Sequence, residues 1–167
     1  MYRDMRRKDR QISHEEALEI LQNEEYGFLA TVDKNNQPYV VPLSYVLIKN
    51  EIFFHSAFSG QKIDNIANEE KVCFSVVGKT QPVYDKNFTT YFESVVVYGK
   101  ARIIDAIDVK KDVLFELAKK YLPDCIDMAE GAIKGSISRT GIIALTIDHI
   151  TGKAKRKKLH QQESNIT

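Results

Sequence analysis

Residues Phe54-His-Ser-Ala-Phe-Ser-Gly-Gln-Lys-Ile63 join a predicted β-strand to a predicted α-helix. The strand is rich in β-branched and aromatic side chains, and the Ser and Gly residues that follow it are typical of a turn. The helix is expected to begin at Gln61. Its first backbone N–H groups have no helical partner and carry a partial positive charge, while Ser56, Ser59 and Lys62 add hydroxyl donors and a full charge. The sequence therefore predicts a turn that binds an anion such as a phosphate.

The segments on either side of this turn predict an antiparallel sheet. Strands are expected at residues 27–32, 39–48, 51–55, 72–77, 89–104 and 141–150, with a loop at 78–88, and the first three strands form a meander. Pro42 cannot donate to a strand ladder, so it marks a sheet edge, a bulge or a face where a ligand replaces the neighbouring strand. Gly99 is expected at a bulge or a close backbone approach. Six strands with short connections predict a mainly β fold with flanking helices, a small six-stranded antiparallel barrel.

Helices are expected beside this sheet. Ser13-His-Glu-Glu16 has the pattern of a capping box and begins the first helix, and a short second helix is expected over 63–68. The third helix is expected over 108–121. Its residues Val109, Val113, Leu117 and Tyr121 recur at four-residue spacing, as along one side of a helix.

The composition is that of one soluble domain. The chain has 167 residues, of which 43% are hydrophobic and 28% charged. We expect residues 1–158 to form this single domain and the polar residues 159–167 to be disordered. No run of about 18 apolar residues is present, so no membrane span and no membrane partner are expected. No apolar stretch follows the basic first residues, so no signal peptide is expected and the predicted location is cytoplasmic.

Positive charge is concentrated at both ends of the chain. Residues 1–10 carry five basic and two acidic side chains, and residues 153–167 carry five basic and one acidic. Such ends occur in proteins that bind nucleic acid or anionic membranes, and also as solvated tails or as arms over a partner subunit or an anionic ligand. No aromatic residue interleaves the run Lys155-Arg-Lys-Lys158, so no nucleic-acid partner is expected.

No residues have the spacing of a metal site or of a nucleophilic catalyst. Cys73 and Cys125 are far apart and have no His or Cys neighbour at metal-ligand spacing, so reduced thiols and no metal are expected. His55, at the end of its strand, is either a structural donor or a titrating group beside a redox cofactor or substrate. The aromatic residues Phe88, Tyr91, Phe92 and Tyr98 either belong to the core or wall a planar ring. A phosphate-binding turn without a nucleophile or metal is explained by a cofactor that brings its own chemistry.

Five segments carry a resemblance to a known family. They are Tyr39-Val-Val-Pro-Leu-Ser-Tyr45, Phe54-His-Ser-Ala-Phe-Ser-Gly-Gln-Lys62, Thr89-Thr-Tyr-Phe-Glu-Ser-Val95 with Tyr98-Gly-Lys100, and Ile147-Asp-His-Ile-Thr-Gly-Lys153. Over nearly its whole length the chain resembles the flavin-binding split-barrel proteins related to pyridoxamine 5'-phosphate oxidase, and within these the nitroimidazole-resistance (Nim-type) group. The resemblance implies a Greek-key split barrel that forms a homodimer, with one FMN in each of two clefts at the subunit interface.

The resemblance also assigns residues of this chain to the cofactor. It implies phosphate and ribityl contacts from His55, Ser56, Ser59, Gln61 and Lys62, flavin-edge contacts from Val41, Pro42, Leu43 and Ser44, and contacts near the ring from Ser94 and Lys153. His55 occupies the histidine position of the Nim-type group, close to the flavin and the substrate, and is the expected catalytic residue.

The resemblance implies a flavoprotein of the reductase type. FMN would take electrons from a nicotinamide or another reductant and pass them to a small acceptor, which for a Nim-type protein is a nitroimidazole reduced to its amine. True pyridoxamine phosphate oxidases end in an Arg- and His-containing segment that holds the substrate phosphate. This chain ends differently and contains no Trp, so synthesis of pyridoxal phosphate is not expected. The alternative function is a module that binds or stores a flavin or a haem without turnover.

Overall fold

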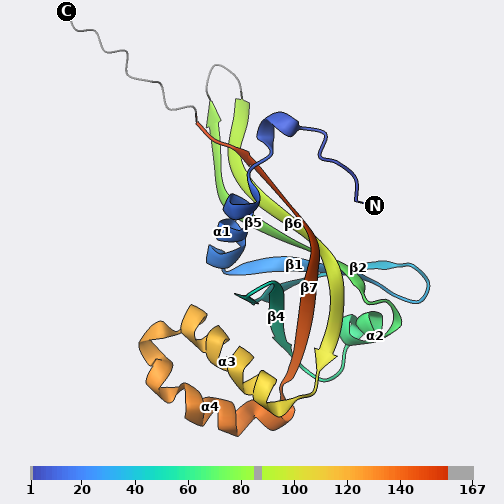
Figure 1. Ribbon diagram of the computed structural model, residues 1–167, viewed down its shortest axis with the longest axis vertical. Coiled ribbons are helices and arrows are strands. Elements are labelled where there is room, and N and C mark those ends of the chain that lie inside the picture. Colours follow the sequence, from blue (N-terminus) through green and yellow to red (C-terminus); the bar gives the residue numbers. More distant parts are fainter. Residues whose placement is uncertain (1, 85–87, 158–167) are drawn as a thin grey trace, which may run out of the picture.

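The computed structural model describes residues 2–84 and 88–157, and the tail expected at 159–167 lies outside them. This part of the chain forms a mainly antiparallel β fold with flanking helices, as predicted, but with seven strands in place of six (Figure 1). The strands are β1 (Tyr26–Val32), β2 (Pro38–Ser44), β3 (Val46–Ile48), β4 (Glu51–Ser56), β5 (Lys71–Tyr84), β6 (Phe88–Ile104) and β7 (Gly141–Lys155). The helices are α1 (His14–Asn23), α2 (Gln61–Asn68), α3 (Ile107–Tyr121) and α4 (Ala129–Ser136), with short 3-10 helices at Lys8–Arg10, Pro123–Met128 and Ile137–Arg139.

The additional strand arises because the strand predicted at 39–48 is interrupted at Tyr45. The Tyr45 side chain is fully buried, and its hydroxyl donates to the Leu21 carbonyl oxygen at 2.6 Å. The Tyr45 backbone N–H donates to the Tyr121 hydroxyl at 2.8 Å instead of to a strand. The chain therefore turns a corner between β2 and β3 at this residue.

The sheet has the strand order β2-β1-β5-β6-β7-β4-β3. β2 and β3 are consecutive in the chain yet lie at opposite ends of this order, so the corner at Tyr45 joins the two ends and the sheet curls into a split barrel. The predicted meander is wrong. β1 pairs with β2 and β3 pairs with β4, but these two hairpins lie at opposite ends of the sheet.

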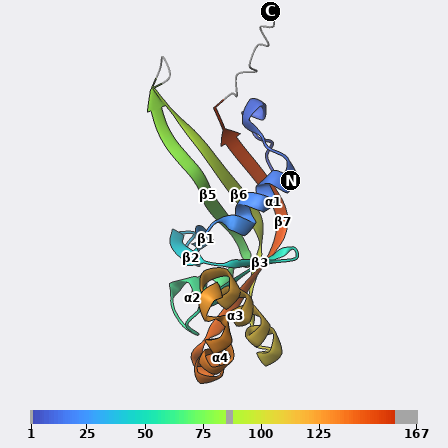
Figure 2. The ribbon, with the colours of Figure 1, turned by 90° about the vertical axis from the view of Figure 1, so that its left-hand side faces the viewer.

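β5 and β6 continue beyond the barrel as a long hairpin, which we call the arm (residues 78–84 and 88–94). Their ladder runs as far as Tyr84 opposite Phe88, so the loop predicted at 78–88 is wrong. Gly78 is accommodated by a register shift between Val77 and Thr80, and Pro82 is tolerated because the pairing of β1 with β5 ends at Val76. Figures 1 and 2 show the arm rising from the barrel, with the end of β7 beside it.

The prediction of a bulge at Gly99 is confirmed. The register between β6 and β7 shifts between Tyr98 and Gly99. A Cβ atom at Gly99 would clash with the Thr146 carbonyl oxygen, so the close approach of the two strands requires glycine. The bulge places His149 opposite Tyr98 on the outside of the barrel, where its ring stacks on Tyr2 at 4.7 Å between centroids.

The barrel interior is filled by a hydrophobic core that includes Leu29, Phe54, Phe74, Val95 and Leu145. α1 adds Ala17 and Leu21 to this core and begins at the predicted capping box, in which Ser13 accepts the Glu16 N–H at 3.1 Å. α2 is attached to β1 by the buried Asn65, whose amide nitrogen donates to the buried Thr31 hydroxyl at 2.9 Å. This bond fixes the position of the helix that follows the predicted anion-binding turn.

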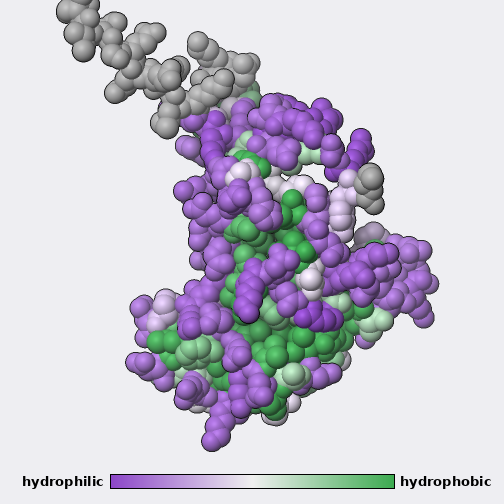
Figure 3. Space-filling model, viewed as in Figure 1, coloured by the Kyte–Doolittle hydropathy of each residue, from purple (hydrophilic) through white to green (hydrophobic). Residues whose placement is uncertain are grey.

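α3 covers the outer face of β3, β4 and the start of β7, where Val113 and Leu117 pack against Phe53 and Ile142. Figure 3 shows hydrophobic side chains gathered in the lower half of the molecule, where α3 lies beside the strands, and a more hydrophilic surface above. Val109 does not belong to the packed face, because it is 39% exposed, whereas Lys110 is only 7% exposed. The four-residue spacing therefore marks the packed face at Val113 and Leu117 but not in the first turn, where Lys110 is the buried residue.

The described residues contain neither a candidate membrane-spanning helix nor a candidate metal site. No helix in them is long and apolar enough to cross a membrane. The same residues contain no group of three His, Cys, Asp or Glu side chains that could hold a metal ion, and Cys73 and Cys125 are free cysteines.

Candidate functional site

The predicted succession of strand, turn and helix is present between β4 and α2. Gly60 precedes the helix with φ +128°, a conformation that other residues rarely adopt. Its carbonyl oxygen accepts the N–H groups of Ile63 at 2.8 Å and Asp64 at 3.1 Å. The N–H groups of Gln61 and Lys62 precede these bonds and find no partner in the described part of the chain, and no side chain caps the helix. The turn therefore presents unpaired amides, which is what an anion site requires.

The side chains around the turn are compatible with an anionic ligand. Lys62 is half-buried and forms no ion pair with any described carboxylate, and His55, Ser59 and Gln61 are exposed. Ser56 already donates its hydroxyl to the Ala57 carbonyl oxygen at 2.7 Å. Among these residues, Lys62 is thus the one that offers a full positive charge to a ligand at the turn.

A second cation beside the turn, Lys110 of α3, was not identified by the sequence pattern. Its Nζ lies 4.8 Å from the centroid of the Phe58 ring, which belongs to the turn. Buried lysines are normally paired, but no hydrogen bond or ion pair of this ammonium is found among residues 2–84 and 88–157. No buried side-chain nitrogen in those ranges lacks a hydrogen-bond partner, so the ammonium group reaches solvent. Lys110 therefore adds positive charge next to the turn.

β2 carries the four residues that the resemblance assigns to the flavin edge. The strand lies at one end of the sheet order, so one of its backbone edges is unpaired, and of the alternatives for Pro42 the structure shows a sheet edge. Val41 and Leu43 pack against the barrel core, whereas Pro42 and Ser44 are exposed on the opposite face. Val41 and Leu43 are half-buried and therefore offer a ligand mainly their backbone groups.

Ser94 and Lys153 lie far from the turn in a single chain. They are paired with each other across β6 and β7, whereas Ser56 at the end of β4 is paired with Gly141 at the start of β7. The twelve residue-to-residue steps along β7 from Gly141 to Lys153 span about 40 Å of strand at ~3.3 Å per step. One chain does not bring these two groups of predicted site residues together.

The outer face of β2, β1, β5 and β6 carries exposed hydrophobic side chains, which we call the outer patch. Its members are Tyr26, Phe28, Val40, Val77 and Tyr98, and each is between 38% and 57% exposed. Ser44, opposite Tyr26, and Ser94, opposite Val77, lie along one border of the patch. An exposed apolar patch beside polar groups is typical of a surface that binds a partner or a ligand.

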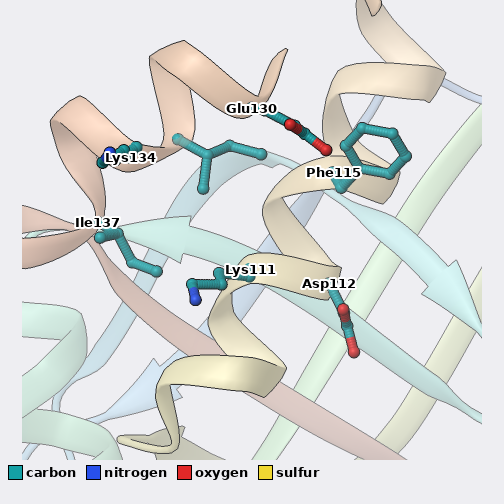
Figure 4. A pocket seen from close by; sticks show the side chains of 7 residues that line it. Lys111, Asp112, Phe115, Glu130, Lys134 and Ile137 are labelled. Carbon is teal, nitrogen blue, oxygen red and sulfur yellow. The ribbon is translucent and has the colours of Figure 1, made fainter.

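A cavity of about 580 Å³ lies between α3 and α4 (Figure 4). It is lined by Lys111, Asp112 and Phe115 of α3 and by Glu130 and Lys134 of α4, with Ile137 at one end. No residue that the sequence assigns to the cofactor lines this cavity. It is separate from the anion-binding turn.

A family model described as pyridoxamine 5'-phosphate oxidase matches residues 13–154 of the chain. No curated protein matches it. One similar solved structure is described as "a putative 5-nitroimidazole antibiotic resistance protein" from Bacteroides thetaiotaomicron, with 21% identity, a TM-score of 0.72 and 86% of each chain covered. The FAD and heme binding protein from Mycobacterium smegmatis has 19% identity and a TM-score of 0.77, over 89% of this chain and 74% of that one. The flavocytochrome Anf3 from Azotobacter vinelandii has 18% identity and a TM-score of 0.74, over 92% and 73%. At these identities the similarity shows a shared fold.

Proposed function

The chain belongs to the pyridoxamine 5'-phosphate oxidase family, and from this premise we propose that it is an FMN-dependent reductase. It would transfer electrons from a nicotinamide or another reductant to a small acceptor, a nitro compound of the nitroimidazole type. The observation that supports this proposal most directly is the turn at Gly60, where the N–H groups of Gln61 and Lys62 are unpaired. Amides and a lysine at a helix N-terminus match the phosphate of a mononucleotide.

The residues of the site fit FMN in a consistent way. The amides of Gln61 and Lys62, the Ser59 hydroxyl and the Lys62 ammonium would hold its phosphate, and the unpaired backbone edge of Pro42 to Ser44 would face its ring. When bound, FMN supplies the redox chemistry, because its ring accepts a hydride from one partner and passes electrons to another. The protein's part is to bind and orient the cofactor and to exclude water from it.

A second copy of the chain would complete this site. Ser94 and Lys153 cannot reach the turn of their own chain, as the pairing along β7 makes plain. We propose that they are supplied by the partner subunit of a homodimer, in which the outer patch is buried. The apolar character of that patch and its border with Ser94 support this arrangement.

His55 would act on the acceptor. Its exposed imidazole on β4 can donate a proton to an oxygen that gains electrons. Reduction of a nitro group to an amine consumes six electrons and six protons and releases two waters. Three hydrides from nicotinamide and three protons from solvent balance this reaction, and His55 would deliver protons from solvent.

The visible spectrum of the purified protein tests the proposal. We expect a yellow protein, or one that takes up added FMN, whose flavin absorbance bleaches anaerobically with a nicotinamide donor and recovers with a nitroimidazole. A colourless protein that does not bind added FMN would refute the proposal.

The second candidate function is binding or storage of a flavin or haem without turnover. It is favoured by the shared fold with a solved structure described as an FAD and heme binding protein. Bound flavin that neither bleaches with donors nor recovers with acceptors would support this function, and a haem absorbance band in the purified protein would identify haem as the ligand.

A further inference from the structure

A groove of about 410 Å³ lies where the arm meets the end of β7. It is lined by residues 79–81 of β5, by residues 91–93 of β6, and by Lys155 at the end of β7 with the two residues that follow it. Its volume falls in the range of pockets that bind a ligand of mononucleotide size. None of the residues assigned to the cofactor lines this groove.

The groove is positively charged. Four cations, Lys79, Lys155, Arg156 and Lys157, line it with one carboxylate, that of Glu93. Arg156 is occupied, because it bonds to Glu93 at 2.6 Å and to Glu16 at 2.6 Å. The three lysines form no ion pair with any carboxylate in residues 2–84 and 88–157. The groove thus keeps an excess of positive charge for an anionic ligand.

Aromatic rings lie among these cations. Lys155 Nζ is 5.9 Å from the Tyr91 ring centroid, and Lys153 Nζ is 5.6 Å from the Phe92 ring centroid. The basic run at 155–158 contains no aromatic residue, but Phe92 lies directly opposite Lys155 on the neighbouring strand. Cations interleaved with aromatic rings bind phosphates and stack on planar bases.

The groove is continuous with the predicted cofactor positions. Phe92 and Lys155 form one cross-strand pair, and Ser94 and Lys153 form another two residues away. Residues two apart on a strand share a face and lie about 7 Å from each other. A ligand in the groove can therefore extend to Ser94 and Lys153.

We propose that this groove binds the adenosine-phosphate end of the nicotinamide dinucleotide that serves as electron donor. The inference rests on the proposed function, and it names the donor class and its binding surface. Lys79 and Lys157 contact the phosphates, the ring of Phe92 receives the base, and the nicotinamide end extends toward Ser94 and Lys153, which share the face of Phe92.

The test uses ADP as the probe and isothermal titration calorimetry on the full chain, with FMN affinity measured separately by flavin fluorescence. We expect ADP to bind and each of Lys79→Ala and Lys157→Ala to weaken it about 10-fold, as for a charge-assisted bond to phosphate. Lys34→Ala, which removes an exposed lysine between β1 and β2, should leave ADP affinity unchanged. FMN affinity should be unchanged in all three variants.

A comparison of ADP with pyrophosphate tests the role of the aromatic rings. Stacking of one base on aromatic side chains is worth about 5- to 150-fold in affinity, so ADP should bind more tightly than pyrophosphate by at least that lower factor. Equal affinities would overturn the assignment of the base to Phe92.

Three further outcomes are decisive. No ADP binding, or binding that the lysine variants do not weaken, would overturn the proposal even if FMN binds. ADP binding through the groove in a protein that takes up no FMN would uphold the nucleotide site and overturn its link to the flavin. A single-stranded oligonucleotide that binds more tightly than ADP would overturn the proposal in favour of nucleic acid.

Discussion

At the scale of single residues, Lys62 carries the most specific expectation. Replacement of Lys62 by Ala removes the full charge at the turn and leaves the amides of Gln61 and Lys62 in place, because these belong to the backbone. A hydrogen bond to a charged group is worth about 1.5–3 kcal/mol, so FMN affinity should fall about 10- to 150-fold. Titration of flavin fluorescence in the purified variant measures this change.

Lys34→Ala serves as the matched control for Lys62→Ala, since it removes an exposed lysine that lies between β1 and β2 and is not part of the turn. It should bind FMN like the native protein. If Lys62→Ala also retains native affinity, the phosphate does not lie at the N-terminus of α2.

The turn could be predicted from local sequence because its backbone conformation is determined by residues that are close together in the chain. The strand, Gly60 and the first turn of α2 follow one another within ten residues, and each has its own propensity signal. Lys110 could not be found in this way. Its burial depends on how α3 is rotated against the sheet, and the exposed Val109 gave the opposite signal. A basic residue on the packed face of a helix can be identified only when the structure shows which face of the helix is packed.

At the scale of elements, Gly99 sets the register of the two longest neighbouring strands. Gly99→Ala places a methyl group against the Thr146 carbonyl oxygen of β7, where the contact is with backbone and cannot be relieved by a side-chain rotation. Overpacking of this kind costs about 1–3 kcal/mol, so the free energy of unfolding should fall by that amount. Urea denaturation followed by circular dichroism measures the change.

Gly131→Ala is the control with the opposite expectation. Gly131 lies within α4, and a Cβ there would meet no atom within 4 Å other than those of its chain neighbours and its own helix backbone. Alanine in a helix is favoured over glycine by about 0.5–1 kcal/mol, so this variant should be slightly more stable than the native protein. A Gly99→Ala variant as stable as Gly131→Ala would show that the strands can separate at the bulge without cost.

The strands were predicted correctly where the alternating pattern of apolar residues is continuous. Their boundaries were wrong where a contact with a residue distant in the sequence interrupts the strand. Tyr45 continues the β pattern of its segment, yet its backbone N–H bonds to the Tyr121 hydroxyl, and this breaks one expected strand into β2 and β3. The arm was missed for the reverse reason. Gly78 and Pro82 are strong turn signals, but the edge of β5 is unpaired beyond Val76 and can hold both.

At the scale of the whole molecule, the sequence pattern predicted the barrel. It could not predict which part of the outer surface of the sheet is left without a helix packed on it. Helix α3 covers β3, β4 and the start of β7, and the outer patch on β2, β1, β5 and β6 has no described helix over it. Which residues are exposed there depends on the closure of the barrel at Tyr45. The separation of Ser94 and Lys153 from the turn has the same origin, since it follows from the curvature and pairing of β7.

The proposed homodimer predicts that charge in the outer patch separates the subunits. Val40→Glu and Val77→Glu each place a carboxylate where the dimer would exclude water, and an unpaired buried charge costs several kcal/mol. Light scattering after size exclusion should give twice the 19.1 kDa chain mass for the native protein and a shift toward 19.1 kDa for both variants. FMN affinity should fall with the dimer fraction, because the turn and Ser94 would no longer meet.

Met128→Glu, at an exposed hydrophobic residue outside the patch, should remain dimeric. A native protein that is monomeric and still binds FMN tightly would show that one chain holds the cofactor alone.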